Sequence, residues 1–165
     1  MLNSAVNISS LPNQPCVSTS RIESFVSETP SQSVFLGGTC GDSQWRSLLR
    51  SKLPEVLTTD PSRIEWSIQN RRKLDKIRKQ SALVVYVFTP PIRGVYSFIE
   101  LSEDAAERPL NTAICLLESE GDTSLAGEAR RQLEIALSKF EDLGVSRLED
   151  LQELSNWIRT RMEIA

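Results

Sequence analysis

The sequence predicts a three-layer α/β domain built on a parallel sheet of four or five short strands. Short apolar runs alternate with amphipathic segments along most of the chain, which is the pattern of repeated strand–helix units. Residues 83–88 form an unbroken run of β-branched, aromatic and other apolar side chains, as expected for a strand buried on both faces. Strand–helix–strand connections of this kind are right-handed and make neighbouring strands parallel.

Composition limits the chemistry that this domain can perform. The chain has 165 residues, a formal net charge of −3 and no histidine. The charge argues against a partner that is a nucleic acid polymer, and the lack of histidine excludes Ser-His and Cys-His nucleophile pairs. Cys16, Cys40 and Cys115 are widely spaced and indicate neither a disulfide framework nor a metal site. We therefore expect no metal or cofactor, and catalysis by carboxylates, hydroxyls, amides or lysine.

Residues 1–32 are rich in serine, asparagine and proline, and we interpret them as a flexible leader. A targeting peptide is a weaker interpretation because Arg21 is the only basic residue, whereas Glu23 and Glu28 are acidic. No apolar stretch reaches the roughly 18 residues of a spanning helix. We expect a cytoplasmic protein with no membrane contact.

The folded domain is expected at 33–165 and begins with a short strand at 34–36, followed by a glycine-rich turn. Gly37 and Gly38 open this turn, where backbone N–H groups can approach a ligand and the next helix favours an anion. The turn matches neither a Walker A loop nor a dinucleotide fingerprint. The alternative is a plain tight turn. The expected helix at 45–53 has Asp42 or Ser43 as its capping residue.

Further elements follow in order, and one of them is unusually basic. The helix expected at 66–80 carries six lysines and arginines, with Ile68, Leu74 and Ile77 as its buried positions. Its basic face is either a solvated surface or a positive field near a phosphate-bearing substrate. The other expected elements are a strand at 56–57, a strand at 112–117, a polar loop at 118–123, a helix from 125 to about 144, a strand remnant at 145 and a helix at 148–162.

The central strand at 83–88 leads into the segment with the clearest functional signal. Pro90 and the proline after it end the strand because proline has no N–H to donate, and Gly94 permits a sharp turn. Ser97 can then cap a helix or bind a ligand, and Glu100 lies one turn into that helix. Loops at the carboxyl ends of parallel strands form binding sites in open sheets, so Glu100 is expected at such a site.

An ordered set of motifs resembles a known family. The motifs are FLGGT at 35–39, tryptophan and arginine at 45–46, tryptophan at 66, VFTP at 87–90 and GVYSFIE at 94–100. Over about residues 33–118 the chain resembles the nucleoside 2-deoxyribosyltransferase-like family. This resemblance implies a flavodoxin-like fold and cleavage of the N-glycosidic bond of a (deoxy)nucleoside or nucleotide, with transfer of the sugar to another base or to water.

The resemblance also implies roles for individual residues. Glu100 would be the nucleophile, Gly37 and Gly38 would line the sugar side, and Tyr96 and Ser97 would border the pocket. Members of the family often form homodimers, so a homodimer is expected. The chain departs from many relatives in having serine and alanine at 81–82, where they carry an aspartate at the start of the central strand.

Reasoning from the residues completes the predicted site. A carboxylate beneath the anomeric carbon stabilises an oxocarbenium-like state, and a helix N-terminus would keep Glu100 ionised. Tyr96 would orient Glu100 through its hydroxyl. Asp42 is the first choice for the acid that protonates the leaving base, with Asp75 and Asp104 as alternatives. The predicted substrate-binding residues are Gly37, Gly38, Thr39, Trp66, Gly94 and Ser97.

The tryptophans and the overall function leave alternatives open. Trp66, at a loop-to-helix junction, is a candidate for stacking on the base, whereas Trp45 and Trp157 are expected to pack in the core. The alternative function is a non-catalytic module of the same fold that binds or senses nucleotides.

Overall fold

The computed structural model of the protein describes residues 32–90, 92 and 95–164. Most of the expected leader, residues 1–31, and the predicted binding residue Gly94 lie outside these described residues.

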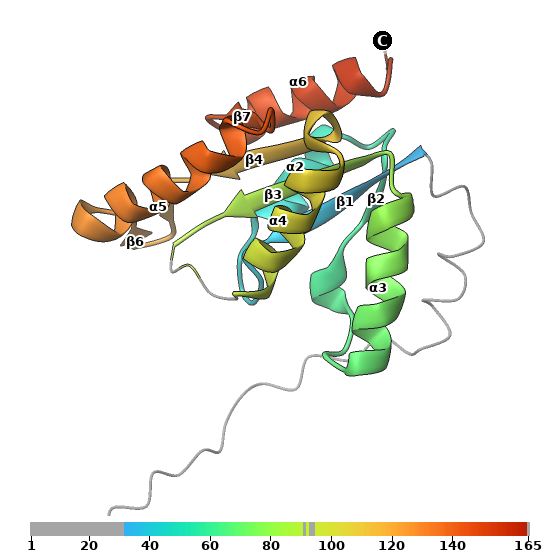
Figure 1. Cartoon of the computed structure of the whole chain (residues 1–165), viewed down its shortest axis with the longest axis horizontal. Coiled ribbons are helices and arrows are strands. Elements are labelled where there is room, and N and C mark those ends of the chain that lie inside the picture. Colours follow the sequence, from blue (N-terminus) through green and yellow to red (C-terminus); the bar gives the residue numbers. More distant parts are fainter. Residues whose placement is uncertain (1–31, 91, 93–94, 165) are drawn as a thin grey trace, which may run out of the picture.

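Five strands form one parallel sheet in the order β2-β1-β3-β4-β7 (Figure 1). This order is that of flavodoxin-like folds and confirms the α/β prediction. The strands are β1 Ser33–Gly38, β2 Leu57–Thr59, β3 Leu83–Phe88, β4 Thr112–Leu116 and β7 Ser146–Leu148. A separate antiparallel ribbon is formed by β5 Ser119–Glu120 and β6 Thr123–Ser124.

Helices cover both faces of the sheet and bury two apolar cores. Side chains of α3 Ile68–Gln80, α4 Tyr96–Glu107 and α5 Gly127–Glu141 pack on one face. Those of α2 Trp45–Lys52 and α6 Leu151–Arg161 pack on the other. Short helical turns at Pro61–Arg63 and Pro109–Asn111 precede α3 and β4. Within the described part of the chain, every helix is too short or too polar to cross a membrane.

Strand β3 occupies the centre of the molecule, as its composition predicts. All six of its side chains are buried, and they alternate between the two cores. Val84, Tyr86 and Phe88 face the core of α3, α4 and α5. The predicted core positions of Trp45 and Trp157 are also confirmed, the first fully buried and the second packed at the edge of its core.

The glycine-rich turn predicted at Gly37 and Gly38 is wrong. Both glycines continue β1, where they pair with Tyr86 and Val87. A Cβ atom on Gly37 would lie 2.5 Å from Cε1 of Tyr86, and Gly38 has a φ of 110°, which other residues rarely adopt. Gly37 therefore leaves room for the Tyr86 ring and Gly38 for the Val87 backbone, and the chain turns only after them.

Helix α3 begins two residues later than predicted. Trp66 was expected to begin the helix, but Ile68 does, and the hydroxyl of the capping residue Ser67 accepts a hydrogen bond from the N–H of Asn70 at 3.2 Å. Leu74 and Ile77 are buried as predicted, but the prediction for Ile68 is wrong because this residue lies at the exposed first turn.

Candidate functional site

The carboxyl ends of β1 and β3 are joined by a pair of buried threonines. Thr89 N–H donates to Oγ1 of Thr39 at 2.9 Å, and Thr39 N–H donates to the carbonyl of Val87 at 2.9 Å. Both threonine side chains are buried. The loops that follow the two strands therefore leave the sheet at the same edge, where ligands bind in such folds.

Ser97 attaches the start of α4 to this edge. Its hydroxyl donates to the carbonyl of Gly38 at 3.0 Å. Helix α4 begins at Tyr96, and Val95 precedes it without a side-chain cap. Of the two roles expected for Ser97, helix cap or ligand contact, the cap is therefore wrong, because its hydroxyl bonds β1. This bond places the first turn of α4 over the end of the strand.

Glu100 lies one turn further along α4 and is only 5% exposed. Burial raises the pKa of Glu100 to about 7, although Arg78 and Arg71 act in the opposite direction. The expectation that the helix terminus keeps this carboxyl fully ionised is therefore wrong: loss of hydration outweighs the favourable charges. A carboxyl with this pKa is populated in both protonation states at neutral pH and suits proton transfer or nucleophilic attack.

Asp104, one turn after Glu100 on α4, belongs to a buried network of ion pairs and hydrogen bonds. The carboxylate of Asp104, 1% exposed, accepts hydrogen bonds from the hydroxyl of Tyr86 at 2.6 Å and from Nε of Arg108 at 3.0 Å. It also pairs with Nη1 of Arg78 at 2.8 Å. The same Nη1 donates to the main-chain carbonyl of Glu100 at 3.0 Å. Asp104 is therefore engaged on both oxygens and is a poor candidate for the catalytic acid.

The network also determines the protonation state of Tyr86. Burial, together with the neighbouring Asp104 carboxylate, raises the pKa of Tyr86 above its ordinary value, so the phenol stays protonated and donates to Asp104. Asp75, the other alternative acid, pairs with Nη2 of Arg78 at 3.2 Å.

Two aromatic side chains and one arginine contact one another near Glu100. The rings of Trp66 and Tyr96 meet edge to face, with centroids 5.4 Å apart. The guanidinium of Arg71 lies 4.2 Å from the Trp66 ring centroid and 6.0 Å from that of Tyr96. Within the described residues no hydrogen bond joins Tyr96 to Glu100, so Tyr96 is placed by ring packing and not by the predicted contact. Trp66 remains 65% exposed, which leaves ring surface available to a ligand.

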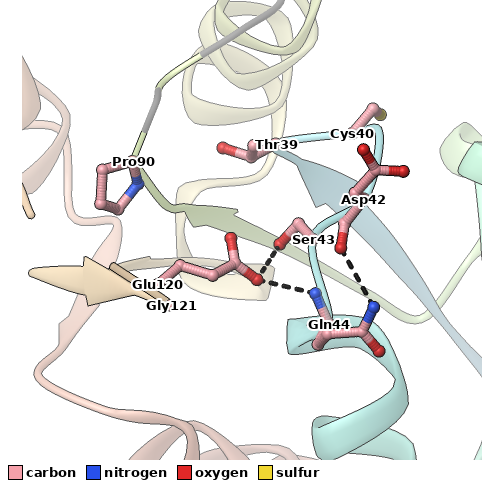
Figure 2. A pocket seen from close by; sticks show the side chains of 8 residues that line it. All are labelled: Thr39, Cys40, Asp42, Ser43, Gln44, Pro90, Glu120 and Gly121. Atoms are coloured by element: carbon pink, nitrogen blue, oxygen red, sulfur yellow. Dashed lines mark hydrogen bonds between the residues drawn. The ribbon is translucent and has the colours of Figure 1, made fainter. Parts of the chain in front are cut away.

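A pocket of about 330 Å³ opens at the same edge of the sheet, on the side of α2. The loop between β1 and α2, Pro90 and the β5–β6 ribbon line it (Figure 2). Thr39 and Asp42, two of the predicted site residues, contribute to its wall. Asp42 is exposed to solvent there.

Glu120, which sequence reasoning missed, binds the N-terminus of α2. Its Oε1 accepts hydrogen bonds from the Ser43 hydroxyl and the Gln44 N–H, each at 2.7 Å (Figure 2). Gln44 precedes α2 without a side-chain cap of its own, so the capping role predicted for Asp42 or Ser43 is wrong. A carboxylate from the β5–β6 ribbon takes that place, where the helix dipole favours an anion.

These contacts determine the charge of Glu120. Burial acts to raise the pKa of Glu120, but hydrogen bonds from Thr89, Ser43 and the Gln44 N–H outweigh it and hold the pKa below its ordinary value. Glu120 is therefore an ionised acceptor at neutral pH. The only signal in the sequence was a glycine, Gly121, within a polar segment.

Gly38 lies between the two parts of the site. Its carbonyl accepts the Ser97 hydrogen bond on the side of α4, and the next residue, Thr39, lines the pocket on the other side. The structure thus gathers the predicted residues into two groups around the end of β1. Glu100, Tyr96 and Trp66 form the first group, and Thr39 and Asp42 belong to the second.

The described residues contain no cluster of three or more cysteine, aspartate or glutamate side chains placed to hold a metal ion. No family model, curated protein or solved structure matches the chain. Function is therefore inferred from the residues and their geometry.

Proposed function

We propose that the protein cleaves the N-glycosidic bond of a (deoxy)nucleoside or nucleotide, with Glu100 as the nucleophile. The single observation that supports this most is the placement of Glu100: a buried carboxyl with a pKa of about 7, one helical turn after the Ser97 that bonds the carboxyl end of β1. Buried carboxyls with such raised pKa values concentrate at catalytic sites. Of the motifs that resemble nucleoside 2-deoxyribosyltransferases, FLGGT and VFTP lie at the carboxyl ends of β1 and β3, and GVYSFIE contains Glu100.

The proposed reaction proceeds in two displacements. The ionised Glu100 oxygen forms a bond to the anomeric carbon while the carbon–nitrogen bond breaks, and its electron pair leaves with the base. The base takes up one proton. Water or a second base, losing a proton, then attacks the same carbon and releases Glu100 as a carboxylate. The sugar is thereby transferred to that base or to water.

Two arginines favour the ionised form of Glu100 that this mechanism requires. Arg78 and Arg71 both lower the pKa of Glu100, against the larger effect of burial. Arg78 is itself held by Asp104 and by the Glu100 main chain, so its charge is fixed in position. Such fixed charges keep the Glu100 carboxylate ionised without reorganisation, and that carboxylate then stabilises the cationic sugar.

Asp42 remains the proposed proton donor to the leaving base. It lines the pocket and is open to a ligand, whereas Asp104 and Asp75 are paired with arginines. The exposure of Asp42 also favours the second candidate function, a nucleotide-sensing module. An acceptor that is open to solvent can bind a nucleotide without transferring a proton to it.

Release of free base from a panel of deoxynucleosides and deoxynucleotides, measured by chromatography, tests the proposal. We expect Glu100→Ala to reduce the rate at least about 1,000-fold, because no other carboxylate replaces the nucleophile. Glu107→Ala, at the exposed end of the same helix, is the matched control and should release base normally.

Two other results would contradict the proposed function. Base release by Glu100→Ala at the normal rate would contradict the role of Glu100. If neither protein releases base, but nucleotides raise the melting temperature, the sensing module is correct instead.

A further inference from the structure

The Glu120 pocket, defined by the 39–44 loop, Pro90 and the β5–β6 ribbon, has an acidic lining. Two of the residues that line it, Glu120 and Asp42, are acidic, and none of its described lining residues is lysine or arginine. A site of this charge repels anions and favours groups that donate hydrogen bonds. Its volume of about 330 Å³ is at the lower end of the range for small-molecule sites, which suits a single base or nucleoside.

Glu120 is held in a fixed orientation with one oxygen facing the pocket. The hydrogen bonds from Ser43 and Gln44 both end on Oε1, and the buried Thr89 side chain is a third partner of the carboxylate. Figure 2 shows the second oxygen, Oε2, turned away from these partners and into the space that the labelled side chains surround. A ligand in this space therefore meets a preorganised acceptor, and a rigid acceptor discriminates strongly between donors and other acceptors.

We propose that Glu120 determines base specificity by selecting bases that carry an exocyclic amino group over those that carry a carbonyl at the same position. This inference rests on the proposed function, because it places the leaving base in the Glu120 pocket. An amino group donates to Oε2. A carbonyl oxygen would face a carboxylate without a donor between them, and both acceptors would lose their hydration.

Pairs of substrates with an amino group or a carbonyl at the same position of the base measure this preference. Deoxyadenosine and deoxyinosine differ by an amino group in place of a carbonyl, as do deoxycytidine and deoxyuridine. We expect the wild-type kcat/KM to favour the amino member of at least one pair about 10-fold or more, since an unpaired buried polar group costs at least that much. Glu120→Gln should abolish the preference, because a carboxamide can present either a donor or an acceptor.

Two variants separate recognition from a merely structural role. Ser43→Ala removes one hydrogen bond to Oε1 but keeps the carboxylate, so the preference should persist. Asp122→Asn changes an exposed acid in the same ribbon and should leave the ratio as in wild type. If Ser43→Ala and Glu120→Gln lose the preference equally, Glu120 acts only by holding the ribbon, and the proposal is wrong.

A measurement of free-base binding tests the role of Glu120 without any need for catalytic turnover. Calorimetry with free adenine and hypoxanthine on the full chain should show tighter binding of adenine, and Glu120→Gln should equalise the two affinities. This result without any base release would refute the glycosidic reaction but retain the Glu120 assignment. Equal affinities in the wild type, an unchanged difference in Glu120→Gln, or no binding of either base would overturn the assignment.

Discussion

Burial of the Glu100 side chain raises its pKa from the ordinary 4.5 to about 7. This shift makes the free energy of unfolding depend on pH. The folded protein retains a proton on Glu100 in a pH range where the unfolded chain has released it. The stabilisation from this proton is complete below pH 4.5 and is lost as the pH rises through 7. Above that pH, the charged carboxylate destabilises the folded state.

Replacing Glu100 by glutamine should therefore stabilise the protein at high pH. The amide resembles the protonated acid, so wild type and Glu100→Gln should have similar free energies of unfolding near pH 4.5. At pH 8.5 the variant should be more stable by about 3 kcal/mol, which is the shift of the pKa converted to free energy. Urea denaturation at both pH values measures the difference, and a difference that does not change with pH would contradict the raised pKa.

Individual residues show where sequence reasoning succeeds and fails. The position of Glu100 after the central strand could be predicted, because strand and helix patterns are local. The rise in its pKa could not, because desolvation depends on what packs around it. Glu120 was missed for a similar reason: its partner, the Gln44 N–H, lies 76 residues away. Gly37 was assigned to a turn because the Tyr86 ring that requires a glycine there belongs to another strand.

Helices α3 and α4 are tied together by buried charge as well as by apolar packing. Arg78 of α3 is fully buried and pairs with Asp104 of α4. The helical period correctly predicts Leu74 and Ile77 on the buried face of α3. Arg78 follows on the same face, but its charge suggested a solvated position. A buried ion pair of this kind contributes to geometry more reliably than to stability.

Removing one partner of this pair should be strongly destabilising. Asp104→Ala removes the one carboxylate partner of Arg78 that is itself fully buried, and we expect the free energy of unfolding to fall by about 3–5 kcal/mol. Glu107→Ala removes the exposed acid paired with Lys79 at 3.9 Å and should change it by less than about 1 kcal/mol. Chemical denaturation of both variants at one pH makes the comparison. Equal effects would show that Arg78 does not depend on Asp104.

Across the whole molecule, the sheet could be predicted better than the edge that carries the candidate site. Alternating strands and helices correctly indicated a parallel sheet of four or five strands, and the sheet has five. The β5–β6 ribbon was described only as a polar loop, because strands of two residues have no measurable period. That ribbon supplies Glu120 and closes the pocket, so half of the candidate site depends on an element that leaves almost no pattern in the sequence.

The two halves of the site have opposite character. The half near Glu100 carries aromatic rings and the Arg71 guanidinium, whereas the Glu120 pocket is acidic. Gly38 and Thr39, at the end of β1, lie between them. In our proposal a nucleoside spans this strand end, with its sugar toward Glu100 and its base toward Glu120.

The central claim is that the Glu100 carboxylate bonds to the sugar. Acid quenching of the protein during turnover of a deoxynucleoside, followed by peptide mass spectrometry, tests it most directly. We predict that the mass of one deoxyribosyl unit appears on the peptide that contains Glu100, and that this adduct is absent from Glu100→Gln. A sugar adduct on a different residue, or base release by Glu100→Gln at the wild-type rate, would contradict the claim.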